Sequence, residues 1–258
     1  MTKSALAAVA VLSIASGAFA APPAPPAARP RPGAPPRVLT VVRQTLKHGT
    51  APAYQSVEAA IARGYERAKI PLYWLALQST KTPTEILYLN FHDTVGDADR
   101  AAAIYRDTVP RHADLLKLQQ RLAEYRAAEP KTTLTTRRDE FVYGRTDVDF
   151  TTMAAVQLTV FHVAAGHEGE FVDAATTGRA SPWLLYEATN ESTFVIVAPL
   201  KSTADAKTVT LPRRLRRLRH LGTIEKPQTF VVRASMSHLP PDFLAAARAR
   251  KKTRAPAH

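Results

Sequence analysis

The chain has 258 residues and a formal net charge of +13, from 35 lysines and arginines against 22 aspartates and glutamates. It contains no cysteine, which excludes disulfides, zinc–thiolate sites and a cysteine nucleophile. The basic balance favours anionic partners such as lipid head groups, acidic polymers or small anions.

Residues 1–20 have the pattern of an export signal. Lys3 supplies a positive charge, an apolar run follows, and the segment ends in the small residues Ala18 and Ala20, which suit signal peptidase. The apolar run is shorter than the roughly 18 to 20 residues that span a bilayer as a helix. We therefore expect a mature chain without a transmembrane span and a periplasmic or extracellular location, with an uncleaved membrane anchor as the alternative. Export also argues against nucleic acid as the partner of this basic chain.

Proline and alanine dominate residues 21–37. Repeated prolines restrict φ and remove amide donors, so this segment is expected to be an extended linker. A recognition site for a proline-binding partner is the alternative. At the other end, residues 237–258 form a C-terminal extension with a basic tail.

Residues 38–150 show the pattern of one βαββαβ unit. Alternating apolar and polar residues indicate strands, and apolar residues at three- and four-residue steps, such as Tyr54, Val57 and Ile61, indicate helices. Pro110 is expected to interrupt the second helix. The predicted elements are a strand at 38–47, a helix at 52–69, strands at 72–79 and 85–92, a helix at 97–128 and a strand at 138–144.

Residues 151–236 repeat this order of elements. The stretch 158–161 corresponds to 39–42, and Trp183 corresponds to Trp74. A repeat longer than about 50 residues predicts two fused units rather than a solenoid. The predicted elements are a strand at 154–164, a helix at 167–177, strands at 183–189 and 193–199, a helix within 202–220 and a strand at 228–234.

Each βαββαβ unit is expected to form a four-stranded antiparallel sheet with both helices on one face. The other face is apolar and needs a cover, because exposed apolar surface is unfavourable in water. Two such units can cover each other by packing sheet to sheet.

This arrangement resembles the dimeric α/β-barrel superfamily, which includes antibiotic-biosynthesis-monooxygenase-like and NIPSNAP-like proteins. The matching motif is a strand, a short loop with glycine and a helix with an early aromatic residue: Val41 through Gly49 to Tyr54, and Val160 through Gly166 to Phe171. The resemblance implies an α+β fold in which two tandem ferredoxin-like units form one intramolecular α/β barrel. Members of the superfamily include cofactor-free oxygenases, haem-binding proteins and proteins without an assigned activity, so the resemblance leaves the chemistry open.

Six residues are candidates for a ligand site. Arg43 and His162 are equivalent in the two units and share the strand phase of inward-facing apolar residues, where a polar group needs a partner or a ligand. Trp74 and Trp183 are also equivalent and suit either an apolar pocket wall or the core. Tyr88 and His92 share one strand face, where a histidine suits a general base or a haem ligand.

A basic segment lies near the end of the second unit. On a helix, its leucines would form a stripe that packs on the sheet, and its arginines would flank that stripe. The arginines are either a solvated face or a surface that docks to anionic lipid or another part of the cell envelope. They are Arg213, Arg214, Arg216, Arg217 and Arg219.

No motif assigns catalytic residues, a cofactor or a metal site. The chain has no HExxH pattern, no Gly-x-Ser-x-Gly elbow and no glycine-rich phosphate loop. We therefore expect an exported, non-catalytic protein that binds a small apolar or anionic ligand or interacts with the envelope. The alternative is a cofactor-independent monooxygenase or haem-type enzyme of the dimeric α/β-barrel superfamily.

Overall fold

The computed structural model describes residues 35–143, 150, 153–176, 183–211, 215 and 219–240. The first half contains β1 (Val38–Thr45), α1 (Ala51–Ala68), β2 (Leu75–Ser79), β3 (Glu85–His92), α2 (Val95–Thr108), η1 (Val109–Arg111), α3 (Ala113–Tyr125) and β4 (Lys131–Tyr143). The second half contains β5 (Ala155–Val163), α4 (Glu168–Thr176), β6 (Trp183–Ala188), β7 (Thr193–Leu200), η2 (Thr203–Thr208), η3 (Arg219–Leu221), β8 (Gly222–Ile224), β9 (Gln228–Val232) and η4 (Ala234–Met236).

The described strands form one antiparallel sheet that closes into a barrel. Its order is β7-β6-β4-β1-β3-β2-β9-β5-β8, and a further pairing of β7 with β5 joins the ends of the eight-stranded ring. The short β8 pairs with β5 beyond the point where β9 leaves it. This is the predicted intramolecular α/β barrel of the α+β class.

Both halves have the same strand order, which is the ferredoxin-like one. The first half runs β4-β1-β3-β2 and the second runs β9-β5-β7-β6. The last strand of each half also pairs with the second strand of the other half: β4 with β6, and β9 with β2. The two halves therefore share a continuous hydrogen-bonded wall.

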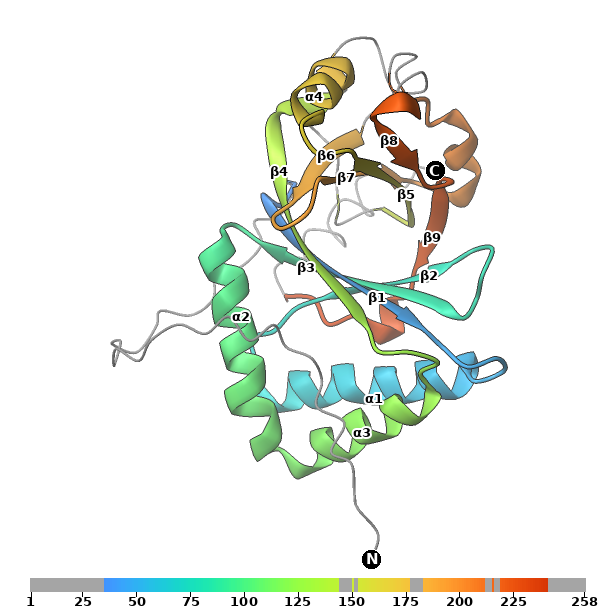
Figure 1. Cartoon of the computed structure of the whole chain (residues 1–258). Helices are drawn as coiled ribbons and strands as arrows, with labels where there is room; N and C mark the ends of the chain where they lie inside the picture. Colours follow the sequence, from blue (N-terminus) through green and yellow to red (C-terminus); the bar gives the residue numbers. More distant parts are fainter. Residues whose placement is uncertain are drawn as a thin grey trace, which may run out of the picture.

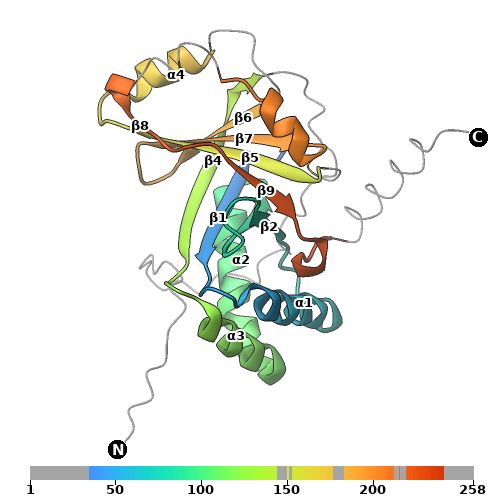
Figure 2. The same ribbon diagram turned by 90° about the vertical axis from the view of Figure 1, so that its right-hand side faces the viewer.

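The helices cover the barrel on opposite sides. Figure 1 and Figure 2 show α1, α2 and α3 below the barrel and α4 above it. The barrel interior holds one apolar cluster that includes Leu39, Leu158 and Phe230, all at most 3% exposed. A second cluster joins α1 and α3 to the outer face of the first sheet, and a third joins α4 to the second sheet. Alternate residues of each strand thus face the interior and the helices.

The break at Pro110 is confirmed, since η1 separates α2 from α3. The predicted start of the following strand is wrong, because β4 begins at Lys131 rather than Arg138. Residues 131–136 pair with β1, and their threonines are β-branched and suited to a strand although they are polar. Within 202–220, the described residues include the 3₁₀ helices η2 and η3 and the helical, fully buried Leu215.

Barrel closure gives the first testable prediction. Phe230 is fully buried on β9, which joins β2 of one half to β5 of the other. We expect Phe230→Ala to lower the free energy of unfolding by about 3–5 kcal/mol, because it opens a cavity at the seam. Urea unfolding followed by circular dichroism measures this change. Thr229→Ala, on the other face of β9, is the control and should cost below about 1 kcal/mol; an equal effect of both changes would contradict the role of Phe230.

Candidate functional site

A cavity of about 600 Å³ lies between the outer face of the first sheet and helices α1, α2 and α3. Strands β1, β3 and β4 form its floor, and the turn between β6 and β7 contributes to its rim. The wall from α2 consists largely of small residues, including Ala98, Ala101 and Ala102. In α2 only Asp97 is buried, so this helix does not pack tightly on the sheet. The alanines therefore leave the space that larger side chains fill elsewhere.

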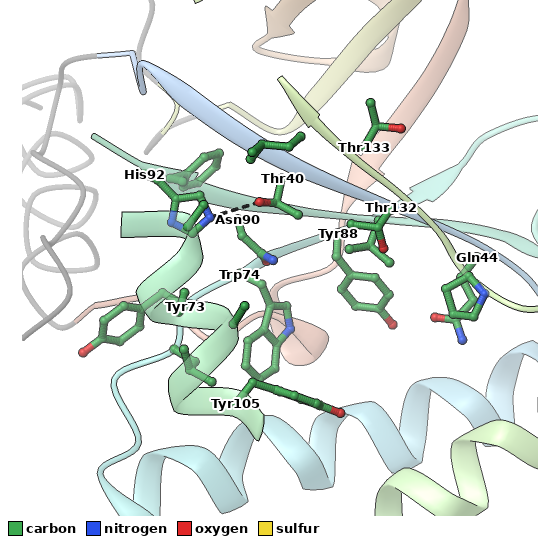
Figure 3. A pocket seen from close by; sticks show the side chains of 18 of the residues that line it. Thr40, Gln44, Tyr73, Trp74, Tyr88, Asn90, His92, Tyr105, Thr132 and Thr133 are labelled. Atoms are coloured by element: carbon green, nitrogen blue, oxygen red, sulfur yellow. Dashed lines mark hydrogen bonds between the residues drawn. The ribbon is translucent and has the colours of Figure 1, made fainter. Parts of the chain in front are cut away.

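Aromatic side chains form much of the cavity wall. Tyr65 and Trp74 meet edge to face with ring centroids 5.0 Å apart, and the Trp74 indole donates to the carbonyl of Met236 at 2.7 Å. Figure 3 shows Trp74 and Tyr105 on the helical side and Tyr88 projecting from the sheet. Rings held in this way provide flat apolar surface with fixed orientation, which suits an aromatic ligand.

A buried carboxyl group, Glu58, also lines the cavity. Glu58 is 6% exposed, and the Tyr54 hydroxyl lies 3.1 Å from its Oε1. The hydroxyls of Tyr54 and Tyr88 are 2.6 Å apart. Burial raises the pKa of Glu58 to about 7, against the opposing effects of hydrogen bonds from Tyr88 and Tyr54 and of the positive charge of Arg126. The cavity therefore contains a carboxyl group that exchanges a proton near neutral pH.

The direction of the hydrogen bonds around Tyr54 depends on the proton of Glu58. The Tyr54 hydroxyl has one proton, and three oxygens lie within reach: the Tyr88 hydroxyl at 2.6 Å, Gln44 Oε1 at 2.7 Å and Glu58 Oε1 at 3.1 Å. An ionised Glu58 accepts hydrogen bonds from Tyr54 and Tyr88, whereas a protonated Glu58 can itself donate to Tyr54. Tyr54 therefore links Glu58 with Gln44 by hydrogen bonds.

His92 lies at another part of the cavity wall. Its Nε2 is 3.2 Å from the Thr40 hydroxyl, and Figure 3 shows this contact. Burial lowers the pKa of His92 to about 4, although Asp97 and Asp99 oppose this effect. The imidazole is therefore neutral at physiological pH.

The predicted site residues fall into separate places. Trp74, Tyr88 and His92 line the cavity. Trp183 is fully buried in the cluster beneath α4. Residues 212–214 and 216–218, which include four of the five arginines of the basic segment, lie outside the described residues, and Arg219 begins η3. The ligand-binding and surface roles of these residues stay predictions.

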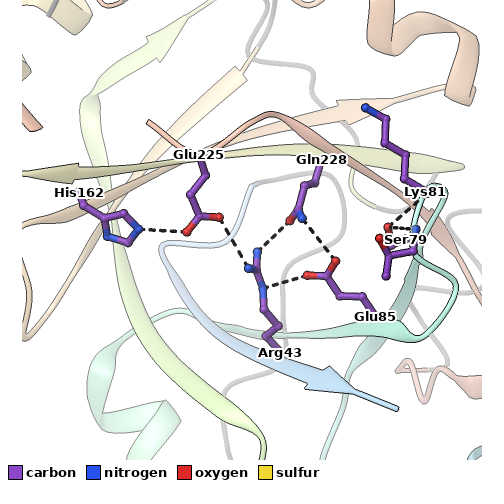
Figure 4. A network of polar contacts seen from close by, with 8 residues as sticks. Arg43, Ser79, Lys81, Glu85, His162, Glu225 and Gln228 are labelled. Atoms are coloured by element: carbon purple, nitrogen blue, oxygen red, sulfur yellow. Dashed lines mark hydrogen bonds and ion pairs between the residues drawn. The ribbon is translucent and has the colours of Figure 1, made fainter. Parts of the chain in front are cut away.

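Arg43 and His162 are brought together by Glu225. Arg43 contacts Gln228 at 3.1 Å, Glu85 at 3.3 Å and Glu225 at 3.7 Å. The other oxygen of Glu225 lies 3.0 Å from His162 Nε2. Figure 4 shows this polar network, which connects the two halves of the barrel. Neither Arg43 nor His162 lines the cavity described above.

Sequence reasoning missed Glu58, although a signal was present. Tyr54, Val57, Ile61 and Tyr65 form the buried face of α1, and Glu58 is four residues after Tyr54 on that face. A carboxylate on the apolar face of a helix needs a compensating partner, because burial penalises its charge. That position could have marked Glu58 as a candidate.

The described residues contain neither a candidate metal site nor a candidate membrane-spanning helix. No group of three or more histidines, aspartates and glutamates there is arranged to bind a metal ion. Within the same residues, no helix combines the length and the apolar character needed to cross a membrane.

Solved structures similar to this chain belong to the suspected superfamily. An anthrone oxidase-like protein aligns with a TM-score of 0.50 at 14% identity, over 78% of this chain and 94% of its own. A variant of chlorite dismutase from Candidatus Nitrospira defluvii aligns with a TM-score of 0.47 at 10% identity, over 81% and 94%. An antibiotic biosynthesis monooxygenase covers 38% of this chain and 94% of its own, with a TM-score of 0.29 at 9% identity. At 14% identity, the likeness to the anthrone oxidase-like protein shows the dimeric α/β-barrel fold alone. No family model and no curated protein matches the chain.

The raised pKa of Glu58 predicts a pH-dependent contribution to stability. Below the unfolded pKa of 4.5 both states are protonated, and this contribution is fully present. It is lost as pH rises toward about 7, because only the unfolded state then ionises freely. We expect Glu58→Gln to gain up to about 3 kcal/mol of unfolding free energy over the wild type between pH 4.5 and pH 8.

Urea unfolding across this pH range measures the difference between the two proteins. The two proteins are compared at each pH because His92 has the opposite effect on stability. Its lowered pKa makes the free energy of unfolding rise with pH from about 4 to 6.5. Glu66→Gln, at an exposed position of the same helix, is the matched control. A constant difference between wild type and Glu58→Gln at all pH values would show that the pKa of Glu58 is not raised.

Proposed function

We propose that the protein is an exported small-molecule-binding protein that accepts a proton from an apolar, aromatic ligand. The cavity binds the ligand, and Glu58 is the proton acceptor. The observation that carries the proposal is the presence of one buried carboxyl group, hydrogen-bonded by tyrosine, in the wall of a mainly apolar cavity.

The size and lining of the cavity support binding. A volume of about 600 Å³ lies within the range of small-molecule sites, which is roughly 300–1,000 Å³. Trp74, Tyr65 and Tyr105 supply flat apolar contacts. A molecule of two or three fused rings satisfies both the volume and the shape.

The environment of Glu58 supports proton transfer. A general base is most effective when its pKa lies near the working pH, and the pKa of Glu58 is raised to about 7 by burial. The ligand must then carry an acidic C–H or O–H group. Deprotonation of such a ligand produces an anion inside the cavity, which either stays bound or reacts further.

This proposal retains two of the functions expected from the sequence, ligand binding and cofactor-independent oxygenation. If the bound anion does not react, the protein is a binding module. If the anion reacts with dioxygen, the protein is a cofactor-independent oxygenase. The export pattern of residues 1–20 supports a periplasmic or extracellular location in either case.

Anthrone is a suitable probe for both steps. It is apolar, it has three fused rings and an acidic C–H group, and one of the similar structures is described as anthrone oxidase-like. One anthrone and one dioxygen give one anthraquinone and one water. The visible absorbance of the anthrone anion measures deprotonation, and the uptake of dioxygen measures turnover.

We expect the rate at which the wild type deprotonates bound anthrone to rise with pH through about 7, because Glu58 must be ionised to accept the proton. Glu58→Gln should bind anthrone with similar affinity and slow its deprotonation by roughly 10²- to 10⁴-fold, because the proton acceptor is lost. Quenching of Trp74 fluorescence measures binding, and stopped-flow absorbance measures deprotonation. Glu66→Gln is the control and should behave as the wild type. Equal deprotonation rates in wild type and Glu58→Gln would contradict the role of Glu58, and binding without ionisation would leave a binding module only.

A further inference from the structure

Two hydrogen-bond donors in the cavity wall have no acceptor among the described residues. They are Nε2 of Gln44 and Nε of Arg126, and both residues line the cavity. Gln44 is 2% exposed, so water does not reach its amide freely. A buried donor left without a partner costs roughly 1–3 kcal/mol. Two such donors at one cavity can be satisfied by a ligand that carries a hydrogen-bond acceptor.

Arg126 brings a positive charge to the same part of the cavity. Its backbone is held at the end of α3 by a hydrogen bond to Ala123 and by a bridge to Leu46 of the first sheet. Arg126 lines the cavity together with Glu58 and Tyr105, and its positive charge opposes the rise in the pKa of Glu58, Tyr54 and Tyr105. Among the described residues, no carboxylate lies within 4.0 Å of it.

The charge at this end of the cavity changes when Glu58 takes up a proton. Glu58 becomes neutral, and Arg126 is then the uncompensated charge beside it. The other acidic side chains of the lining, Asp99 and Glu191, are exposed at the rim. An uncompensated cation in a partly buried site favours a bound anion.

The hydrogen bonds of Tyr54 connect this change to Gln44. Tyr54 donates to Oε1 of Gln44 at 2.7 Å, and it has no carboxylate as a competing acceptor once Glu58 is protonated. Because Oε1 and Nε2 belong to one planar amide, fixing the oxygen also fixes the direction of the Nε2 donor. The terminal torsion of glutamine is soft, so a small rotation presents this donor to the cavity.

We propose that Gln44 and Arg126 bind the negatively charged oxygen that the ligand acquires when Glu58 removes its proton. The ligand is therefore a phenol, or a ketone that ionises to an enolate, on an aromatic skeleton. In this step the C–H or O–H bond breaks, the proton moves to Glu58, and the electron pair becomes the charge on the ligand oxygen. Preorganised donors at the position of a developing oxyanion stabilise it. This inference rests on the proposed function and deepens it by naming the ligand class.

The test uses the full-length Glu58→Gln protein, in which the neutral amide stands in for the protonated carboxyl group. Two probes of similar size are titrated at about pH 9: 4-nitrophenol, which is then an anion, and nitrobenzene, which has no ionisable group. Absorbance of the nitrophenolate and quenching of tryptophan fluorescence give the two dissociation constants. We expect the nitrophenolate to bind more tightly than nitrobenzene.

Adding Arg126→Met or Gln44→Met should weaken nitrophenolate binding by roughly 10- to 100-fold, the effect of losing a hydrogen bond to a charged group. Nitrobenzene binding should change by less than about threefold. Arg121→Met and Gln55→Met are the matched controls, since Arg121 is exposed on α3 and neither residue lines the cavity. Gln44→Glu is a second variant, because it keeps the acceptor for Tyr54 and removes the donor. If Gln44 variants do not fold, the Arg126 result decides alone.

The outcomes separate the two proposals. If nitrobenzene binds but the nitrophenolate has no preference that depends on Arg126 or Gln44, the oxyanion site is wrong and the cavity remains a binding site. If neither probe binds to the wild type or to Glu58→Gln, and anthrone also fails to bind, the proposed function is wrong as well. Loss of both probes in Arg126→Met at an unchanged melting temperature would show a general packing role and would also overturn the oxyanion site.

Discussion

The structure depends on the pairing of edge strands between its two halves. Each half has an apolar sheet face that must leave water, and each has two edges with unpaired backbone groups. Pairing β4 with β6 and β9 with β2 satisfies both requirements, because the ring closes and the two apolar faces become one interior. Apolar side chains from both halves meet in that interior, and the cavity described above lies on the outer face of the first sheet, under the helices.

The two halves use the same strand order but cover their outer faces differently. In the second half, Trp183, Phe171 and Phe194 fill the space beneath α4. In the first half, the alanines of α2 leave a cavity between helix and sheet. Side-chain volume contributes to this difference, because protein interiors are close-packed wherever large residues are present. The first half therefore combines a packed core with a cavity.

The chemistry of the cavity follows from burial of a few polar groups. Glu58 is held away from water, which makes its proton exchangeable near neutral pH. Tyr54 lies within hydrogen-bond distance of both Glu58 and Gln44, and the positive charge of Arg126 opposes the rise in the pKa of Glu58.

The sequence by itself determined the order of the eight strands that close the ring, the break at Pro110 and the barrel expected from two apolar sheet faces, but it did not predict β8. These features follow from local periodicity and from proline geometry, and both can be read from a short segment of the sequence. Sequence patterns also singled out Tyr88 and His92, which share a strand face, and Trp74, the counterpart of Trp183, and all three line the cavity. Only the tertiary structure decided that Tyr54 contacts both Glu58 and Gln44, that Arg126 lines the same cavity and that Glu225 joins Arg43 to His162. Such contacts join residues from different elements. Their distances depend on how the helices pack on the sheet, which the volumes of the side chains between them determine.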